Sequence, residues 1–329
     1  MGKFNTLVLG AAGRLAMPIA VYPGARLVGA SVREIVTNPQ AQADASVAMH
    51  QRYQTPFCLT AMDLSVEAEA FGCQIQMPDD EIPTTVAGVV SNIEQARALA
   101  VPAVGDKRTA VYLETASRLR ALPDGPLVLG GCIGPFSLAG RLVGLSEACS
   151  LTLENPELMH TVLDKCTSFL CAYAQAFKAA GADAVIMAEP AAGLLSPRGL
   201  SAFSAAYIRR IVQAVEDGQF QIVLHNCGAK PVHLATILES GPSAFHFGAL
   251  VDPVAALAKA PVTTVLCGNL DPSAVFLQST PEQLAAKAAQ LLAATRPHRN
   301  FVLSSGCDVP PATPLANLDA FYDTVRRAG

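Results

Sequence analysis

The sequence predicts an α/β protein that folds as a single (β/α)8 TIM barrel with an N-terminal extension. From about residue 120 onward, strand-like apolar runs alternate regularly with helical segments. Each run is continuously hydrophobic, which is typical of parallel strands buried on both faces and permits a doubly wound sheet or a barrel. The 329 residues contain no linker, repeat or low-complexity tract. We therefore expect one domain over residues 1–329, since barrels of this length form one domain.

The predicted strands are short apolar runs that end in polar residues or glycine. In chain order they cover residues 56–64, 126–132, 182–189, 220–227, 244–250, 263–269 and 300–307. An eighth strand is less evident, and the two candidates are residues 6–10 ("TLVLG") and 73–77 ("CQIQM").

The predicted helices lie between these strands, at residues 65–72, 111–123, 156–181, 196–218 and 280–297. The longest of them starts with Pro156 and ends at Gly181. Proline in the first turn and glycine after the last turn are the usual helix boundaries.

Composition excludes several classes of function. The chain is 51% hydrophobic and 15% charged, which is enough apolar material for a large core. Its net charge is −4 and it has no Lys/Arg cluster, so neither nucleic acid nor an anionic membrane is an expected partner. No uninterrupted apolar stretch is long enough to span a membrane. The nine cysteines are an odd number and favour a reducing cytoplasm over a disulfide framework.

Residues 7–20 ("LVLGAAGRLAMPIA") look like the start of a dinucleotide-binding unit. The Gly10–Gly13 spacing is not the full G-x-G-x-x-G pattern, and Pro18 falls where the helix interior should be. We interpret this stretch as a turn that feeds a short connection.

The stretch "VLHNCGAK" places His225 and Cys227 two residues apart at the end of a predicted strand. Residues i and i+2 of a strand point the same way, and the C-terminal strand ends of a barrel form its active-site face. Cys307 occupies the same kind of position after the last strand. Catalytic zinc sites use three imidazole, thiolate or carboxylate ligands and keep one position open. His225, Cys227 and Cys307 are therefore candidate zinc ligands.

Two other interpretations of these residues remain open. In the first, His225 is a hydrogen-bonded residue of the barrel rim and the cysteines are packed side chains with no metal. Alternatively Cys227 is a nucleophile with His225 as its base, although no third group that would orient the histidine is evident.

The chain resembles the uroporphyrinogen decarboxylase superfamily, and within it the methylcobamide:coenzyme M methyltransferase branch, from about residue 38 onward. The resemblance rests on six motifs: "MDLSVEAEAFGC" (62–73), "GPFSLAGRLVG" (134–144), "AGADAVIMAEPAAGLLSP" (180–197), "VLHNCG" (223–228), "CGNLDP" (267–272) and "GCDVPPATPLANLDAF" (306–321). The H-x-C pair with a distant Gly-Cys is the specific feature. The resemblance implies that His225, Cys227 and Cys307 bind Zn²⁺.

Two departures from the family pattern concern the substrate more than the metal. His246 stands where the family often has an acidic residue, and Asp252 lies further on. The decarboxylases carry an Arg-rich N-terminal segment, of which only Arg14 is present here. A multiply carboxylated tetrapyrrole needs several cationic anchors, so this argues against a decarboxylase.

Other strand ends supply further candidate site residues. Glu189 is either a fourth zinc ligand that substrate displaces or a hydrogen-bonded carboxylate of the rim. Asn269 and Asp271 are expected contacts in the substrate pocket, and Cys267 is expected in the core.

The resemblance implies a zinc-dependent methyltransferase that moves a methyl group from a methylated corrinoid to a small thiol such as coenzyme M. Zinc coordination would make the thiol a thiolate. The sequence has no cobalamin-binding pattern of the type D-x-H-x-x-G, so a separate corrinoid protein is the expected partner and the methylcorrinoid is a co-substrate that is not permanently bound. The alternatives are methyl transfer to a tetrahydrofolate-type acceptor, a decarboxylase-like activity, and a non-catalytic zinc-binding protein.

Overall fold

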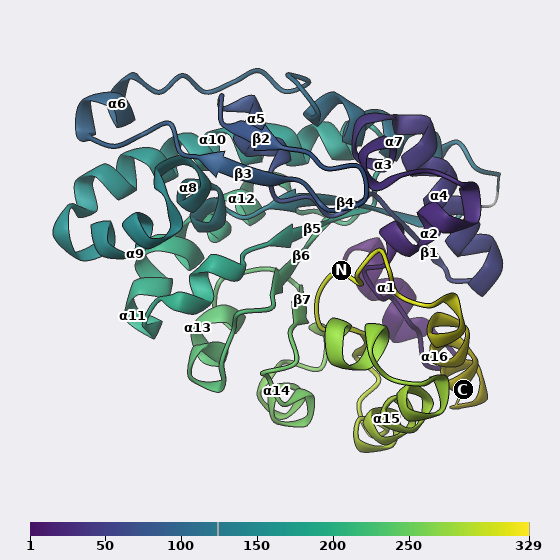
Figure 1. The fold of residues 1–329 in the computed structure, drawn as a ribbon. Helices are drawn as coiled ribbons and strands as arrows, with labels where there is room; N and C mark the ends of the chain where they lie inside the picture. Colours follow the sequence, from purple (N-terminus) through teal and green to yellow (C-terminus); the bar gives the residue numbers. More distant parts are fainter. Residues whose placement is uncertain (124, 329) are drawn as a thin grey trace.

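The centre of the protein is a curled sheet of seven parallel strands surrounded by helices (Figure 1), seen in a computed structural model that describes residues 1–123 and 125–328. The strands are β1 (Phe57–Leu59), β4 (Leu127–Ile133), β5 (Ala184–Ala188), β6 (Gln221–Asn226), β7 (Ala244–Phe247), β8 (Val265–Leu270) and β9 (Phe301–Ser305). They pair in this order, each parallel to the next. All seven predicted strands are confirmed, and so is the α/β class with a TIM-barrel-like arrangement.

Helices surround this sheet and connect its strands (Figure 1). Before β1 they are α1 (Lys3–Gly10), α2 (Val21–Val28), α3 (Val32–Thr37) and α4 (Pro39–Tyr53). After β1 they are α5 (Val66–Ala70), α6 (Ile93–Ala98), α7 (Thr109–Arg120), α8 (Pro135–Val143), α9 (Leu145–Glu154), α10 (Pro156–Ala179), α11 (Pro197–Leu200), α12 (Ala206–Val215), α13 (Leu234–Leu238), α14 (Pro253–Lys259), α15 (Pro281–Ala294) and α16 (Leu315–Ala328). The five predicted helices correspond to α5, α7, α10, α11 with α12, and α15.

The helices begin where the sequence supplies caps. The Asn155 side chain accepts a hydrogen bond from the Leu158 amide at 3.1 Å, and Pro156 follows it at the start of α10. Thr280 forms a capping box with Gln283 ahead of α15. These side chains satisfy amides that have no partner inside the helix.

Both candidates for an eighth barrel strand are wrong. Residues 6–10 lie in helix α1, although their composition suits a strand. Residues 73–77 contain strand β2 (Gln74–Gln76), but β2 pairs antiparallel with β3 (Thr84–Ala87) in a separate two-stranded sheet. Its side chains alternate between exposed and partly buried, unlike those of the barrel strands.

The segment that follows α1 lies beside β9 instead. Ala16 forms an isolated parallel bridge with Leu303, and the Met17 amide donates to the Leu303 carbonyl at 3.0 Å. The hydroxyl of Thr55, just before β1, donates to the Ala16 carbonyl at 3.4 Å. Pro18 has no amide proton, so this pairing cannot extend into a regular strand. Residues 11–20 form the expected turn and connection, whereas residues 7–10 belong to helix α1.

One hydrophobic core runs through the interior of the sheet and the layer between the sheet and its helices. All nine cysteines are free. Among residues 1–123 and 125–328, no helix combines the length and apolarity that crossing a membrane requires.

Candidate metal centre

The fold brings His225, Cys227 and Cys307 together. His225 lies near the end of β6, Cys227 follows that strand, and Cys307 follows β9. One ring nitrogen of His225 and the two sulfur atoms all lie within 4.8 Å of one another. Because the parallel strands end at the same rim, residues eighty positions apart in sequence become neighbours.

Close packing of the adjoining loops holds this cluster. A Cβ atom at Gly248, just after β7, would lie 2.5 Å from the carbonyl oxygen of Cys227. Only glycine allows the two loops to approach this closely. His225 is 2% exposed, whereas both cysteines are partly exposed.

The thiols of Cys227 and Cys307 shift each other's pKa in opposite directions. The contact with the Cys307 thiol holds the pKa of Cys227 below its ordinary value. The same contact, together with burial, raises the pKa of Cys307 to about 12, although His225 acts in the opposite direction. Cys227 is thus the thiol that ionises first, with Cys307 as its hydrogen-bond donor.

This donor set suits zinc. An imidazole and two thiolates are common zinc ligands, and tetrahedral coordination with Zn–S of about 2.3 Å and Zn–N of about 2.0 Å separates the ligand atoms by roughly 3.5–3.8 Å. The observed cluster, within 4.8 Å, needs only a small contraction to reach that spacing. Within the described residues the cluster has three members, so a tetrahedral zinc held by them would have a fourth position for a substrate group.

His225 contacts a second buried histidine, His246. The Nδ1 atoms of His225 and His246 are 2.8 Å apart, and Nε2 of His246 lies 2.8 Å from the Ser304 hydroxyl. Burial, with a smaller effect from His225, lowers the pKa of His246 well below its ordinary value. His246 is therefore neutral at physiological pH.

Glu189 lies at the end of β5 but outside the cluster. Its carboxylate accepts hydrogen bonds from the Phe136 amide (2.8 Å), the Ser137 amide (2.9 Å) and the Ser204 hydroxyl (2.8 Å). Phe136 and Ser137 are in the first turn of α8, so Glu189 satisfies two free amides of that helix. Of the two expectations for Glu189, this geometry matches the hydrogen-bonded carboxylate.

Asn269 and Asp271 are engaged with backbone. The Asn269 amide donates to the carbonyls of Gly248 (2.9 Å) and Val251 (2.6 Å), which ties β8 to the loop after β7. Asp271 caps the turn that follows β8 by accepting from the amides of Ser273 and Ala274. Cys267 is 1% exposed, as expected for a core residue.

A cavity of about 450 Å³ lies next to the segment Pro190–Leu194. It is lined by Leu64, Thr85, Val86, Ala87, Gly88, Ile133, Ser137, Gly140, Arg141, Gly144, Leu145, Pro190, Ala191 and Leu194. The segment Pro190–Leu194 forms one wall, and its Gly193 packs directly on the backbone of Gly228, next to Cys227. Arg141 is the charged residue of this mostly apolar lining. Within the described ranges 1–123 and 125–328, no ion pair or side-chain hydrogen bond engages its guanidinium.

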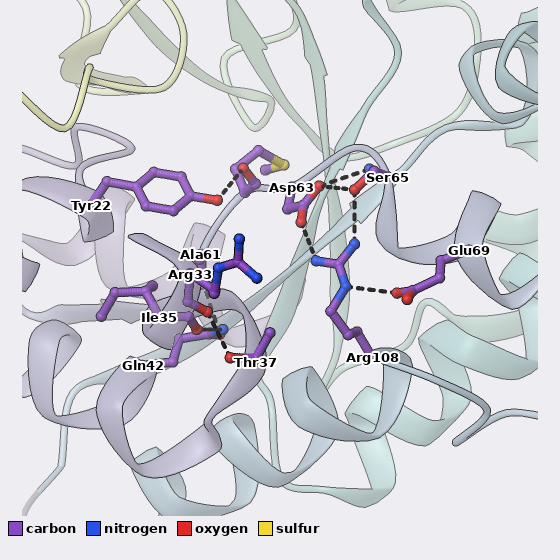
Figure 2. Close-up of polar contacts among 11 residues, drawn as sticks. Tyr22, Arg33, Ile35, Thr37, Gln42, Ala61, Asp63, Ser65, Glu69 and Arg108 are labelled. Atoms are coloured by element: carbon purple, nitrogen blue, oxygen red, sulfur yellow. Dashed lines mark hydrogen bonds and ion pairs between the residues drawn. The ribbon is translucent and has the colours of Figure 1, made fainter. Parts of the chain in front are cut away.

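The buried Arg108 is, by contrast, fully engaged (Figure 2). It forms an ion pair with Asp63, donates to Glu69 at 2.6 Å and donates to the Ser65 hydroxyl at 2.8 Å. The N-terminal Arg14 lies at the opposite end of the barrel, where it donates to the carbonyls of His298, Phe301 and Thr295. Neither arginine is free to bind a substrate carboxylate.

Sequence reasoning missed the roles of Arg141 and Ser304. Arg141 lies inside the motif "GPFSLAGRLVG" (134–144), but only the tertiary structure shows that it lines a cavity. Ser304 stands three residues before Cys307 on an apolar strand, and a buried serine there was the available signal.

The chain is similar to known proteins over most of its length. The sequence pattern of the uroporphyrinogen decarboxylase (URO-D) family matches residues 12–328. Methylcobamide:CoM methyltransferase MtbA of Methanosarcina acetivorans is 29% identical over 290 residues, which cover 87% of this chain and 82% of that protein. Uroporphyrinogen decarboxylase of Pseudomonas paraeruginosa is 26% identical over 315 residues, covering 92% and 88%.

Among solved structures, a methyltransferase from Methanosarcina mazei has the same fold. The TM-score is 0.88 at 24% identity, over 98% of this chain and 97% of that one. The chain therefore belongs to the uroporphyrinogen decarboxylase family, and its likeness to the methylcobamide:CoM methyltransferases confirms the predicted methyltransferase branch.

Proposed function

We propose that this protein is a zinc-dependent methyltransferase that moves a methyl group from a methylated corrinoid to a small thiol such as coenzyme M. The observation that carries the proposal is the cluster of His225, Cys227 and Cys307 at the rim of the barrel. The relatives named as methylcobamide:CoM methyltransferases support it. Residues 1–329 are taken as one domain, in keeping with the single large sheet and continuous core.

His225, Cys227 and Cys307 would hold the zinc ion. When bound, zinc lowers the pKa of a coordinated thiol so that the acceptor is a nucleophilic thiolate near neutral pH. The two protein thiolates balance the charge of the metal, and the partly exposed cysteines leave one side of the cluster open to the acceptor. The acceptor thus needs no side-chain base.

The 450 Å³ cavity supports an anionic acceptor. Its apolar walls suit a short carbon chain, and among residues 1–123 and 125–328 no carboxylate forms an ion pair with the Arg141 guanidinium. A guanidinium binds an anionic group such as a sulfonate through charge-assisted hydrogen bonds. We propose Arg141 as the residue that binds the anionic end of the thiol.

The methylcorrinoid would arrive on a separate corrinoid protein as a co-substrate. Val86, Leu145 and Leu194 line the cavity and are 56%, 48% and 60% exposed. Exposed apolar side chains around a cavity are typical of surfaces that bind a partner. This rim is therefore our proposed entrance for the corrinoid.

A decarboxylase acting on a multiply carboxylated tetrapyrrole is disfavoured, although uroporphyrinogen decarboxylases are among the relatives. Such a substrate needs several free cations. Arg14 lies at the far end of the barrel, and Arg108 is neutralised by Asp63 and Glu69.

The test is a metal analysis combined with a methyl-transfer assay. We expect about one zinc per chain, and transfer from free methylcobalamin to coenzyme M that exceeds transfer to a neutral thiol such as 2-mercaptoethanol. Zinc X-ray absorption should show one additional sulfur ligand when coenzyme M binds. Zinc-bound protein that gains no sulfur ligand with any thiol would exclude thiol methylation, and methyl transfer to tetrahydrofolate would then be assayed.

A further inference from the structure

A chain of buried hydrogen bonds runs from the metal centre across the barrel interior. It starts at Nδ1 of His225, which contacts Nδ1 of His246 at 2.8 Å. It continues from Nε2 of His246 to the Ser304 hydroxyl at 2.8 Å, and from that hydroxyl to the Met17 carbonyl at 2.6 Å. His246 and Ser304 are 0% exposed, so no bulk water takes part.

The far end of this chain fixes the direction of each hydrogen bond. The Met17 carbonyl is buried, and within residues 1–123 and 125–328 no donor other than Ser304 reaches it. A buried carbonyl without a donor is costly, so the single hydroxyl proton of Ser304 is committed to Met17. Ser304 must then accept from His246, which places a proton on Nε2 of His246.

The remaining protons follow from this assignment. A neutral imidazole carries one proton, so Nδ1 of His246 is an acceptor. His225 must therefore donate from its own Nδ1 to form the 2.8 Å contact. Its Nε2 then carries a lone pair and is the nitrogen left to coordinate a metal, in keeping with a His225 ring nitrogen within 4.8 Å of the sulfur atoms of Cys227 and Cys307.

We infer that His246 is a positioning residue: anchored by Ser304, it holds His225 as the Nδ1–H tautomer, with Nε2 ready to coordinate the metal. The inference rests on the proposed function for the identity of the metal. Metal-binding histidines usually donate to a carboxylate, a carbonyl or water. An imidazole in this role keeps the ring in place without adding negative charge to a site that already has two thiolates.

The first test is the tautomeric state in the zinc-free protein. Proton–nitrogen correlation spectra of ¹⁵N-histidine-labelled protein distinguish Nδ1–H from Nε2–H rings. We expect His225 as Nδ1–H and His246 as Nε2–H. The opposite pair of tautomers would overturn the inference, because the hydroxyl of Ser304 would then donate to His246.

Two matched serines test the anchor. Ser304→Ala removes the acceptor for His246, and we expect His225 to show a mixture of tautomers. The control is Ser305→Ala, since the neighbouring Ser305 is equally buried and its hydroxyl accepts from the Ile19 amide at 3.1 Å. An unchanged single tautomer in Ser304→Ala, or equal mixing in both variants, would count against the inference.

The second test is zinc affinity, measured by competition with a chelator. His246→Phe leaves the Nδ1–H of His225 without an acceptor, and we expect about 10–100-fold weaker binding, the usual effect of losing such a partner. His246→Asn can place its carbonyl oxygen near the former Nδ1 position and should bind within about threefold of wild type. Equal loss in both variants would indicate a merely structural role, and no loss in either would overturn the inference.

The zinc measurements distinguish a failure of this inference from a failure of the proposed function. Wild-type protein that binds no zinc would refute the zinc proposal. Wild-type protein that binds zinc tightly, with variants of unchanged affinity, would refute only the role of His246.

Discussion

Metal binding at the candidate centre depends on the sulfur atoms of Cys227 and Cys307. Replacing Cys227 or Cys307 by alanine leaves two ligands, and we expect bound zinc to fall from about one per chain to a small fraction. The fold should remain, because both side chains lie at the rim and are partly exposed. Metal analysis with circular dichroism measures both effects. The control is Cys267→Ala, a buried cysteine of β8 outside the cluster, which should keep its zinc. Wild-type zinc content in both rim variants would refute the assignment.

Arg141 is expected to select the charge of the acceptor. Arg141→Gln removes a charge-assisted contact, so KM for coenzyme M should rise about tenfold or more while kcat changes little. KM for a neutral thiol such as 2-mercaptoethanol should stay within about twofold. Steady-state kinetics with methylcobalamin measures these values. Arg141→Lys keeps the charge and should be intermediate. If KM for both thiols rises equally, the residue shapes the cavity rather than recognising an anion.

The three candidate ligands could be predicted because each stands at or just after the end of a predicted parallel strand. His225 and Cys227 share a strand face by the period of two, and Cys307 ends another parallel strand. The contact between His246 and Ser304 could not be predicted in the same way. It depends on the shear and curvature of the sheet, which bring β7 and β9 together across the barrel interior.

At the scale of elements, Glu189 joins β5 to the start of α8. Glu189→Ala leaves the amides of Phe136 and Ser137 and the Ser204 hydroxyl without their acceptor. Each buried unsatisfied group costs about 1–3 kcal/mol, so with three such groups the free energy of unfolding should fall by roughly 3 kcal/mol or more. Chemical denaturation measures this loss, and Glu189→Gln should lose less. Zinc content per folded chain should not change; its loss in both variants would instead identify Glu189 as a ligand.

The eighth barrel position shows where element prediction failed. Residues 6–10 are apolar and β-branched in part, yet they fold as α1 because tertiary packing overrides a weak local preference. The segment beside β9 contains Pro18, whose missing amide limits its pairing and hides it from a search for regular strands. The seven confirmed strands were predictable because each is buried on both faces and therefore reads as a continuous apolar run.

At the scale of the whole molecule, the fold places ionisable groups in the layer around the barrel rim. Figure 2 shows that Asp63, Ser65, Glu69 and Arg108 form one network there. Arg108 is 6% exposed and neutralised by its neighbours. Glu67, on the same short helix α5, forms no ion pair within residues 1–123 and 125–328. Its Oε1 accepts from the Ile133 amide at 3.0 Å. Burial of this carboxyl couples the stability of the whole fold to pH.

Burial raises the pKa of Glu67 to about 8. In the unfolded chain this carboxyl ionises near its ordinary value, about 4.3. Between these two values the folded state binds one more proton than the unfolded state, so the free energy of unfolding falls as pH rises, by about 1.4 kcal/mol per pH unit from this group. The stabilisation is complete below a pH of about 4.3 and is lost as the pH rises through about 8.

Glu67→Gln should remove this dependence. The amide keeps an oxygen for the Ile133 amide and cannot ionise, so the variant should gain stability relative to wild type as pH rises from 5 to 8, by roughly 3–4 kcal/mol in all. Denaturation with urea at several pH values measures the difference. Glu154→Gln, at an exposed position at the end of α9, is the control and should follow wild type at every pH. A Glu67→Gln curve parallel to that of wild type would mean that Glu67 is already ionised in the folded protein, with its charge stabilised by the nearby Arg108.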